Sequence, residues 1–91
     1  MIMYVKYLAP YNFALGKKTD SINIPDKDSI SVWDLLVHIA KNEPRFTKTA
    51  VLEKESVLNK LSVLVEGTVC NLESTVTDGA NIVLMSPVCG G

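Results

Sequence analysis

Long apolar segments are missing from this sequence of 91 residues. No run of about 18 apolar residues is present, so we expect no segment that spans a membrane and no membrane partner. The opening residues, MIMYVKYLAP, lack the charged-then-apolar order and the small-residue cleavage site of a signal peptide. We therefore expect a cytoplasmic protein.

A strong charge of either sign is also missing. Nine Lys and Arg residues stand against ten Asp and Glu residues, and the formal net charge is -1. Lysines such as Lys27 and Lys48 are scattered along the chain, and we interpret them as solvating charges. Because nucleic-acid phosphates bind concentrated positive charge, we expect no nucleic-acid partner.

Cysteine and histidine are scarce. Cys70 and Cys89 form no CxxC motif and no Cys/His cluster, so we expect no zinc or iron–sulfur site. Reduced thiols are favoured over a disulfide, since the cytosol keeps thiols reduced. The single histidine, His38, has Asp34 and Lys41 as helical neighbours and no nucleophile nearby in sequence, so we interpret it as a solvated residue.

The overall composition is that of a folded protein. Hydrophobic residues make up 47% of the chain and charged residues 21%. This content is too apolar for intrinsic disorder, and the chain is too short for two separate cores. We predict one domain over residues 1–85, followed by an extended, flexible tail over residues 86–91.

Several segments have the pattern of β-strands. Residues 3–9 alternate apolar and polar side chains, whereas the last predicted strand contains the continuous apolar run IVLM. The predicted strands, in chain order, are residues 3–9, a segment carrying Ile22 and Ile24, a segment within KLSVLVEG (60–67), the short TVC (68–70) and Asn81–Met85. Tight turns are expected at residues 15–18, Glu66-Gly67 and Asp78-Gly79, and Pro10, Pro25 and Pro87 end strands.

One helix is clear, within SISVWDLLVHIAKNEP (29–44). Ser31 is its predicted N-cap with Asp34 as a capping-box-like partner, and Asn42 and Pro44 mark its end. Its apolar stripe comprises Val32, Leu35, Leu36, Ile39 and Ala40, with Trp33 and Val37 at the margin. In the weakly patterned segment 45–58 a short helix around Thr47–Lys54 is the one element we predict.

This order of elements predicts a two-layer α+β sandwich. The continuous apolar run of the last strand would make a poor exposed edge, so we place this strand inside the sheet. There it lies parallel to the first strand, joined through the helix crossover. The result is a β-grasp (ubiquitin-like) fold, a mixed sheet of four to five strands with one main helix packed across it.

The sequence closes with SPVCGG, residues 86–91. Six residues reach at most about 20 Å, and the two glycines, without Cβ atoms, suit a narrow partner site. The terminal carboxylate is an anion at neutral pH. It can attack the α-phosphorus of ATP to form an acyl-adenylate. A sulfur nucleophile would convert this adenylate to a thiocarboxylate, and a lysine amine would convert it to an isopeptide. The alternative is an inert end.

Several segments carry a resemblance to a known family: VKYLA, SVWDLL, VLVEG, TDGANIVLMSPV and the final Gly-Gly. Together they resemble the MoaD/ThiS family of ubiquitin-like sulfur carriers, and they look most like its molybdopterin synthase small subunits. Ser86 stands where those subunits commonly have a first proline, and Glu66-Gly67 stands where the family often has Asn-Gly. The resemblance implies that Gly91 is adenylated and then thiocarboxylated. It also implies that the rest of the tail inserts into a partner: Gly90, Cys89, Val88 and Pro87.

The resemblance further implies a set of partners. These are a ubiquitin-activating-like adenylyltransferase that consumes ATP, a sulfur-donating persulfide enzyme and a molybdopterin synthase large subunit, paired in a heterotetramer. The chain itself would bind no cofactor and would serve as a non-catalytic, sulfur-donating subunit in molybdenum or tungsten cofactor synthesis. Three alternatives stay open: a thiamine-type sulfur carrier, a ubiquitin-like modifier, and an interaction domain with an inert tail. Cys89 is interpreted as a small tail residue, with thiol exchange as the alternative.

Overall fold

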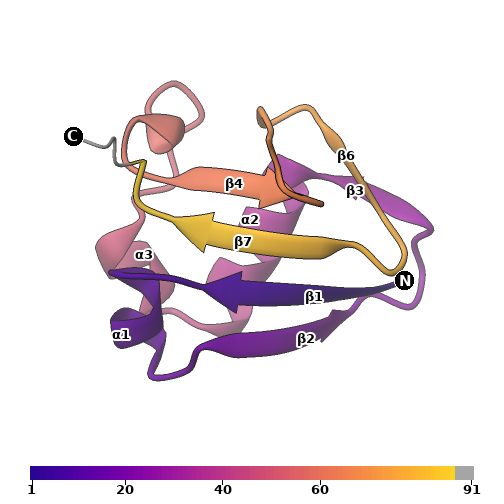
Figure 1. Cartoon of the computed structure of the whole chain (residues 1–91), viewed down its shortest axis with the longest axis horizontal. Helices are drawn as coiled ribbons and strands as arrows, with labels where there is room; N and C mark the ends of the chain where they lie inside the picture. Colours follow the sequence, from indigo (N-terminus) through magenta and orange to yellow (C-terminus); the bar gives the residue numbers. More distant parts are fainter. Residues whose placement is uncertain (88–91) are drawn as a thin grey trace.

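A five-stranded mixed sheet forms one layer of the computed structural model, which describes residues 1–87 (Figure 1). Its strand order is β2-β1-β7-β4-β5, with β7 parallel to β1 and the other pairs antiparallel. The strands are β1 (Ile2–Tyr7), β2 (Thr19–Asn23), β4 (Ser62–Val65), β5 (Thr68–Val69) and β7 (Asn81–Met85). The predicted internal, parallel position of the last strand is confirmed.

Alternation along β1 decides which face of the sheet becomes the core. Met3, Val5 and Tyr7 are buried, while Tyr4 and Lys6 point to the other face. The predicted second strand is slightly too long, because β2 ends at Asn23. Ile24 lies beyond it, although its N–H still donates to the Met1 carbonyl at 2.9 Å.

Helix α2 (Val32–Asn42) covers the core face of the sheet. The Ser31 hydroxyl accepts the Asp34 N–H at 3.0 Å, which confirms the predicted N-cap. The helix ends at Asn42, and the Glu43 N–H closes it on the Ile39 carbonyl at 2.8 Å. Its buried residues are Val32, Leu35, Leu36 and Ile39, with Ala40 and Trp33 partly buried beside them.

Three short elements escaped sequence prediction. Residues 11–15 form a helix, α1 (Tyr11–Leu15), where the sequence indicated only a turn over 15–18. A second sheet pairs β3 (Ser29–Ser31) with β6 (Thr75–Thr77). Tertiary contacts hold α1, since Tyr11 donates its hydroxyl to the Lys60 carbonyl at 2.7 Å and packs on Phe46. Such short elements have too few residues to show a periodic pattern.

The weakly patterned segment 45–58 contains α3 (Phe46–Thr49) and a 3-10 helix, η1 (Val57–Asn59). The predicted helix over Thr47–Lys54 is therefore wrong after its first residues. The backbone becomes extended at Ala50, immediately after α3. The Ala50 N–H donates to the Phe46 carbonyl at 2.8 Å and so ends the helix. Phe46, Ala50 and Val57 are buried, so three anchors rather than a continuous helix hold this connection.

Both predicted glycine turns are present. Glu66 and Gly67 have φ angles of 50° and 81°, and they join Val65 to Thr68 in a two-residue hairpin loop. The Glu66 carboxylate accepts the Asn81 N–H at 2.7 Å, which ties this loop to the start of β7. Gly79, with φ of 83°, makes the second turn. Over residues 1–87, no helix is long and apolar enough to cross a bilayer.

Candidate functional site

The tail leaves the sheet from its centre. β7 ends at Met85, between β1 and β4, and the Leu8 N–H donates to the Leu84 carbonyl at 2.9 Å just before this point. The exit lies at the end of the molecule where α1 and α3 also lie (Figure 1). Pro87 is exposed and is the last described residue. The predicted site residues Val88, Cys89, Gly90 and Gly91 lie outside the described residues.

The face of the sheet opposite α2 is open, and its side chains lie in rows across the strands. Along β7, Ile82 and Leu84 are buried against the core, whereas Val83 and Met85 point to this open face. Lys6 lies opposite Val83, and Val83 lies opposite Leu64. The continuous apolar run of β7 therefore contributes side chains both to the core and to the open face of the sheet.

Apolar side chains gather on this open face over β1, β7, β4 and β5, and one of them, Met85, lies at the tail exit. We call the set the docking face; it consists of Tyr4, Leu64, Val69, Val83 and Met85. Val69 is 68% exposed and Tyr4 is 51% exposed. Exposed apolar side chains gathered on one sheet face are typical of a protein interaction site. The docking face runs directly into Ser86 and Pro87.

Toward β2 the open face turns polar. A shallow hollow of about 680 Å³ extends across β2, β1 and β7, and Tyr4 and Val83 contribute its apolar side. Lys6, Thr19 and Ser21 contribute its polar side. A partner on this face would meet mainly apolar side chains over β7, β4 and β5 and mainly polar side chains toward β2.

In the part of the chain that the structure describes, no group of three or more His, Cys, Asp or Glu residues is placed to hold a metal ion. Cys70 carries a free thiol that is half-buried, and its Sγ lies 3.3 Å from the Thr68 carbonyl oxygen. The free thiol of Cys70 agrees with the reduced state that the sequence favoured.

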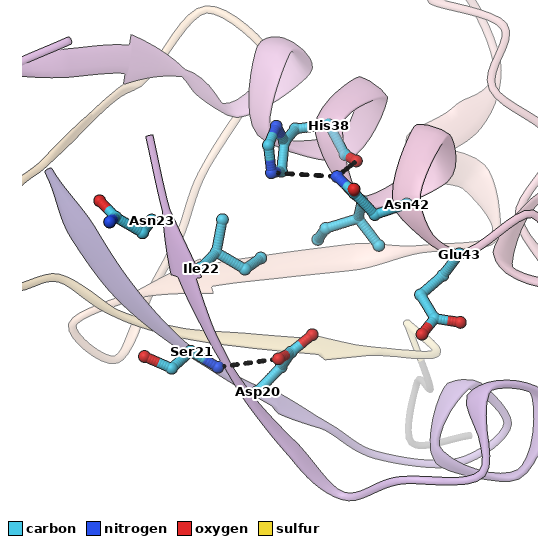
Figure 2. Close-up of a pocket in the computed structure, with 8 residues that line it drawn as sticks. Asp20, Ser21, Ile22, Asn23, His38, Asn42 and Glu43 are labelled. Carbon is cyan, nitrogen blue, oxygen red and sulfur yellow. Dashed lines mark hydrogen bonds between the residues drawn. The ribbon is translucent and has the colours of Figure 1, made fainter. Parts of the chain in front are cut away.

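His38 is less solvated than the sequence indicated. It is half-buried and lines a hollow between β2 and α2, with its Nε2 atom 3.1 Å from Asn42 Nδ2 (Figure 2). The interpretation of His38 as a solvated helix residue is therefore refined, since the side chain lies half-buried at the edge of α2. Helical spacing places His38 near Asp34 and Lys41, but only the tertiary fold brings it opposite β2.

An ionic network ties β2 to the end of α2. Lys17 Nζ lies 2.9 Å from an Asp20 oxygen and 3.1 Å from a Glu43 oxygen. The hydrogen bond and charge of Lys17 lower the pKa of Glu43. Burial, and secondarily the Asp20 carboxylate, raise the pKa of Tyr7, whose hydroxyl is 3.4 Å from Asp20. Sequence reasoning missed this network because Glu43, its member on the helix side, lies 26 residues from Lys17.

A β-grasp domain whose exposed apolar sheet face continues into a Gly-Gly tail belongs to the class of ubiquitin-like carrier proteins. Comparison with known families narrows this class. The model of the ThiS family matches residues 5–91, and the chain belongs to this family. The resemblance inferred from the sequence is thereby confirmed.

Solved structures agree on the fold. SAMP1 from Haloferax volcanii has a TM-score of 0.83 at 21% identity, with 100% of both chains covered. A putative molybdopterin converting factor subunit 1 from Pyrococcus furiosus has a TM-score of 0.76 at 21% identity, covering 97% of this chain and 99% of that one.

A third similar structure comes from a complex. It is the complex of subunits 1 and 2 of molybdopterin-converting factor from Helicobacter pylori 26695. One of its chains matches with a TM-score of 0.62 at 20% identity, and the match covers 100% of the present chain and 100% of that chain. No curated protein matches the sequence. At these identities the similarities establish the β-grasp, ubiquitin-like fold.

Proposed function

We propose that this protein is a sulfur carrier that serves as the small subunit of molybdopterin synthase. The observation that carries the proposal is the continuity between the docking face and the tail. β7 supplies Val83 and Met85 to the docking face and, two residues later, Pro87 to the tail exit. A partner that binds the docking face therefore receives the Gly-Gly end that follows.

The proposed chemistry takes place on the Gly91 carboxylate. A ubiquitin-activating-like adenylyltransferase binds the docking face, and a carboxylate oxygen attacks the α-phosphorus of ATP with loss of pyrophosphate. The terminal sulfur of a persulfide on the sulfur-donating enzyme attacks the acyl-adenylate and displaces AMP, which gives an acyl disulfide. A second thiol of the partner enzyme then attacks the enzyme-side sulfur of this disulfide, forms a protein disulfide and releases the acyl-bound sulfur. The product is a thiocarboxylate on Gly91. ATP belongs to the partner enzyme, and the carrier needs no cofactor of its own.

Sulfur delivery uses the same tail. We propose that Pro87, Val88, Cys89 and Gly90 enter the large subunit of molybdopterin synthase, in a heterotetramer, so that the thiocarboxylate reaches a pterin precursor. The sulfur then becomes part of the dithiolene that binds molybdenum or tungsten. The similar Helicobacter pylori chain was solved as a complex of subunit 1 with subunit 2, which supports a large-subunit partner. We place these steps in the cytoplasm.

The main competing function is protein modification. Related structures include small archaeal modifier protein 1, and an isopeptide-forming modifier would use the same adenylate. A thiamine-type carrier would form the same thiocarboxylate and differ in the acceptor. The identity of the sulfur acceptor distinguishes the two kinds of carrier from each other. Formation of a lysine-linked adduct distinguishes the modifier from both.

The first test is the intact mass of the purified protein after incubation with ATP, a sulfur donor and its host's adenylating enzyme. Exchange of one terminal oxygen for sulfur adds about 16 Da, which is also the gain expected from one methionine oxidation. The matched control is therefore the same chain without Gly90-Gly91, and a thiol-acid-selective alkylation identifies the thiocarboxylate. We expect a gain that depends on the tail and is alkylated.

Transfer to the acceptor is tested separately. Thiocarboxylated protein with a molybdopterin synthase large subunit and the pterin precursor should return to its original mass as the dithiolene forms. A lysine-linked adduct with no thiocarboxylate would favour the modifier instead. Absence of any tail-dependent change, with an activating enzyme shown to be competent on its own carrier, would reject both tail-based functions.

A further inference from the structure

The edge of the sheet formed by β2 borders a groove on its helix side. β2 pairs with β1 alone among the described strands, so its other edge is unpaired. Between this edge and α2 lies a hollow of about 320 Å³ (Figure 2). Its floor contains the apolar side chains of Ile22 and Ile39. Its rim is polar and consists of Asp20, Ser21, Asn23, His38, Asn42 and Glu43, of which Asp20 and Glu43 are both paired with Lys17.

The hydrogen-bond pattern shows which backbone groups of β2 point outward. The Lys18 carbonyl accepts the Tyr7 N–H at 2.8 Å, and the Ile24 N–H donates to Met1 at 2.9 Å. In an antiparallel pair these bonds alternate, so even-numbered residues face β1 and odd-numbered residues face away from the sheet. Thr19, Ser21 and Asn23 therefore direct their backbone groups toward the groove edge.

The Asp20 side chain covers one of these outward backbone groups. Its Oδ1 atom accepts the Ser21 N–H at 2.9 Å, in the place where the carbonyl of an added strand would accept it (Figure 2). Charged side chains of this kind protect edge strands from unselective pairing. A specific partner must therefore replace this bond and offer further contacts along the groove.

A second hollow extends the groove and supplies such contacts. It has a volume of about 230 Å³, shares His38 with the first, and has Ile24, Ile30 and Val37 on its apolar side. Lys27 and Lys41 also line it, together with one acidic residue, Asp34. Neither lysine belongs to an ion pair within residues 1–87. The fold thus gathers two lysines that look scattered in the sequence.

We propose that this groove binds an extended segment of a partner protein, which adds to β2 as a further strand. The segment places apolar side chains over Ile22 and Ile39 and an acidic residue near Lys27 and Lys41. β2 spans about 17 Å at the usual rise per residue, so the bound segment has about five residues. The two free lysines are the reason for its acidic character.

This second interaction surface goes beyond the sulfur-carrier proposal and does not rest on it. The docking face lies on the open side of the sheet, whereas the groove lies at the β2 edge on the side covered by α2. Because β1 separates β2 from β7, the groove can be occupied while the tail is engaged elsewhere. A segment bound there would tether the carrier to an assembly without blocking its chemistry.

The test uses a synthetic peptide, acetyl-Val-Ile-Val-Glu-Asp-Asp-amide, titrated into the full chain and followed by amide chemical shifts. We expect saturating shifts in β2 and α2, with the amides of the docking face unchanged. The double variant Lys27→Glu/Lys41→Glu should bind about tenfold more weakly, because two attractive contacts become repulsive. Lys48→Glu/Lys60→Glu makes the same change in net charge away from the groove and should stay within about twofold.

A second variant pair tests strand addition itself. Asn23→Pro removes an outward N–H but leaves the bonds between β1 and β2, because residue 23 faces away from β1. It should abolish peptide binding while the amide spectrum shows a folded protein, and Asn23→Ala should bind as the unchanged chain does. Equal weakening by both lysine double variants, or unchanged binding by Asn23→Pro, would overturn the proposal. So would a β2-mediated dimer in the absence of peptide, since a second copy would then occupy the groove.

Discussion

The two faces of β7 use similar residues for different purposes. Ile82 and Leu84 are 1% and 0% exposed beneath α2, whereas Val83 and Met85 alternate with them on the open face and are half-buried. Burial of the first pair stabilises the fold through the hydrophobic effect. The second pair loses less water-accessible area on folding and keeps area for a partner. Which face a residue occupies therefore matters more than how apolar it is.

The largest expected effect comes from the core side. Leu84→Ala should lower the free energy of unfolding by about 3 kcal/mol, because it removes buried methyl groups and leaves a cavity. Val83→Ala, one residue away on the open face, should cost about 1 kcal/mol or less. Urea unfolding of both variants measures the difference. Equal losses would contradict the division of β7 into a stabilising and a docking face.

The open face should show the opposite behaviour in binding. Val83→Asp should weaken binding to the adenylating partner by about 2 kcal/mol, since it places a charge within the apolar docking face. The free energy of unfolding should change much less in Val83→Asp than in Leu84→Ala. Val51→Asp, a like substitution at an exposed valine outside the sheet, is the control. The affinity measured by calorimetry should fall by about 30-fold in Val83→Asp and stay unchanged in Val51→Asp.

The cover over the core face depends on the start of α2. Ser31→Ala removes the hydroxyl that accepts the Asp34 N–H and should cost about 1 kcal/mol of unfolding free energy. Ser31→Asp retains an acceptor at the same position and should recover most of that loss. The midpoint of urea unfolding distinguishes the two. A Ser31→Asp variant as unstable as Ser31→Ala would show that the cap bond contributes little.

The smallest effect at neutral pH concerns the two tyrosines of β1, which point to opposite faces. Burial raises the pKa of Tyr7 above that of an unfolded phenol, near 10. Stability from its neutral form is therefore complete below the unfolded pKa and is lost as pH rises toward the folded value. Tyr7→Phe should flatten the fall in melting temperature above about pH 10. Tyr4→Phe, on the open face, leaves Tyr7 in place and should retain the fall.

Much of the fold was predictable because it depends on local patterns. Alternation in β1, the apolar stripe and Ser31 cap of α2, and the glycine turn at residues 66–67 each involve neighbours in the chain. The internal position of β7 followed from its uninterrupted apolar run. α1 and the β3–β6 pair were missed, since each is held by contacts between distant segments and is too short for a periodic signal.

The candidate sites also differ in how much of each could be predicted from the sequence. The tail proposal needs only the order of residues after β7, so the sequence pointed to it, and residues 88–91 stay a prediction. The division into a domain over 1–85 and a tail over 86–91 has the same standing. The docking face requires the registers between β1, β7, β4 and β5, which no single segment contains.

The sequence by itself determined the fold class, the carrier family it resembles and the chemistry available to a Gly-Gly carboxylate, because these follow from periodicity and from the order of a few residues. Only the tertiary structure decided which apolar side chains remain open and that Lys27 and Lys41 share one hollow with His38. The reason is physical. Exposure and charge proximity arise when strands and helices from distant parts of the chain pack together, and local sequence carries no measure of those distances.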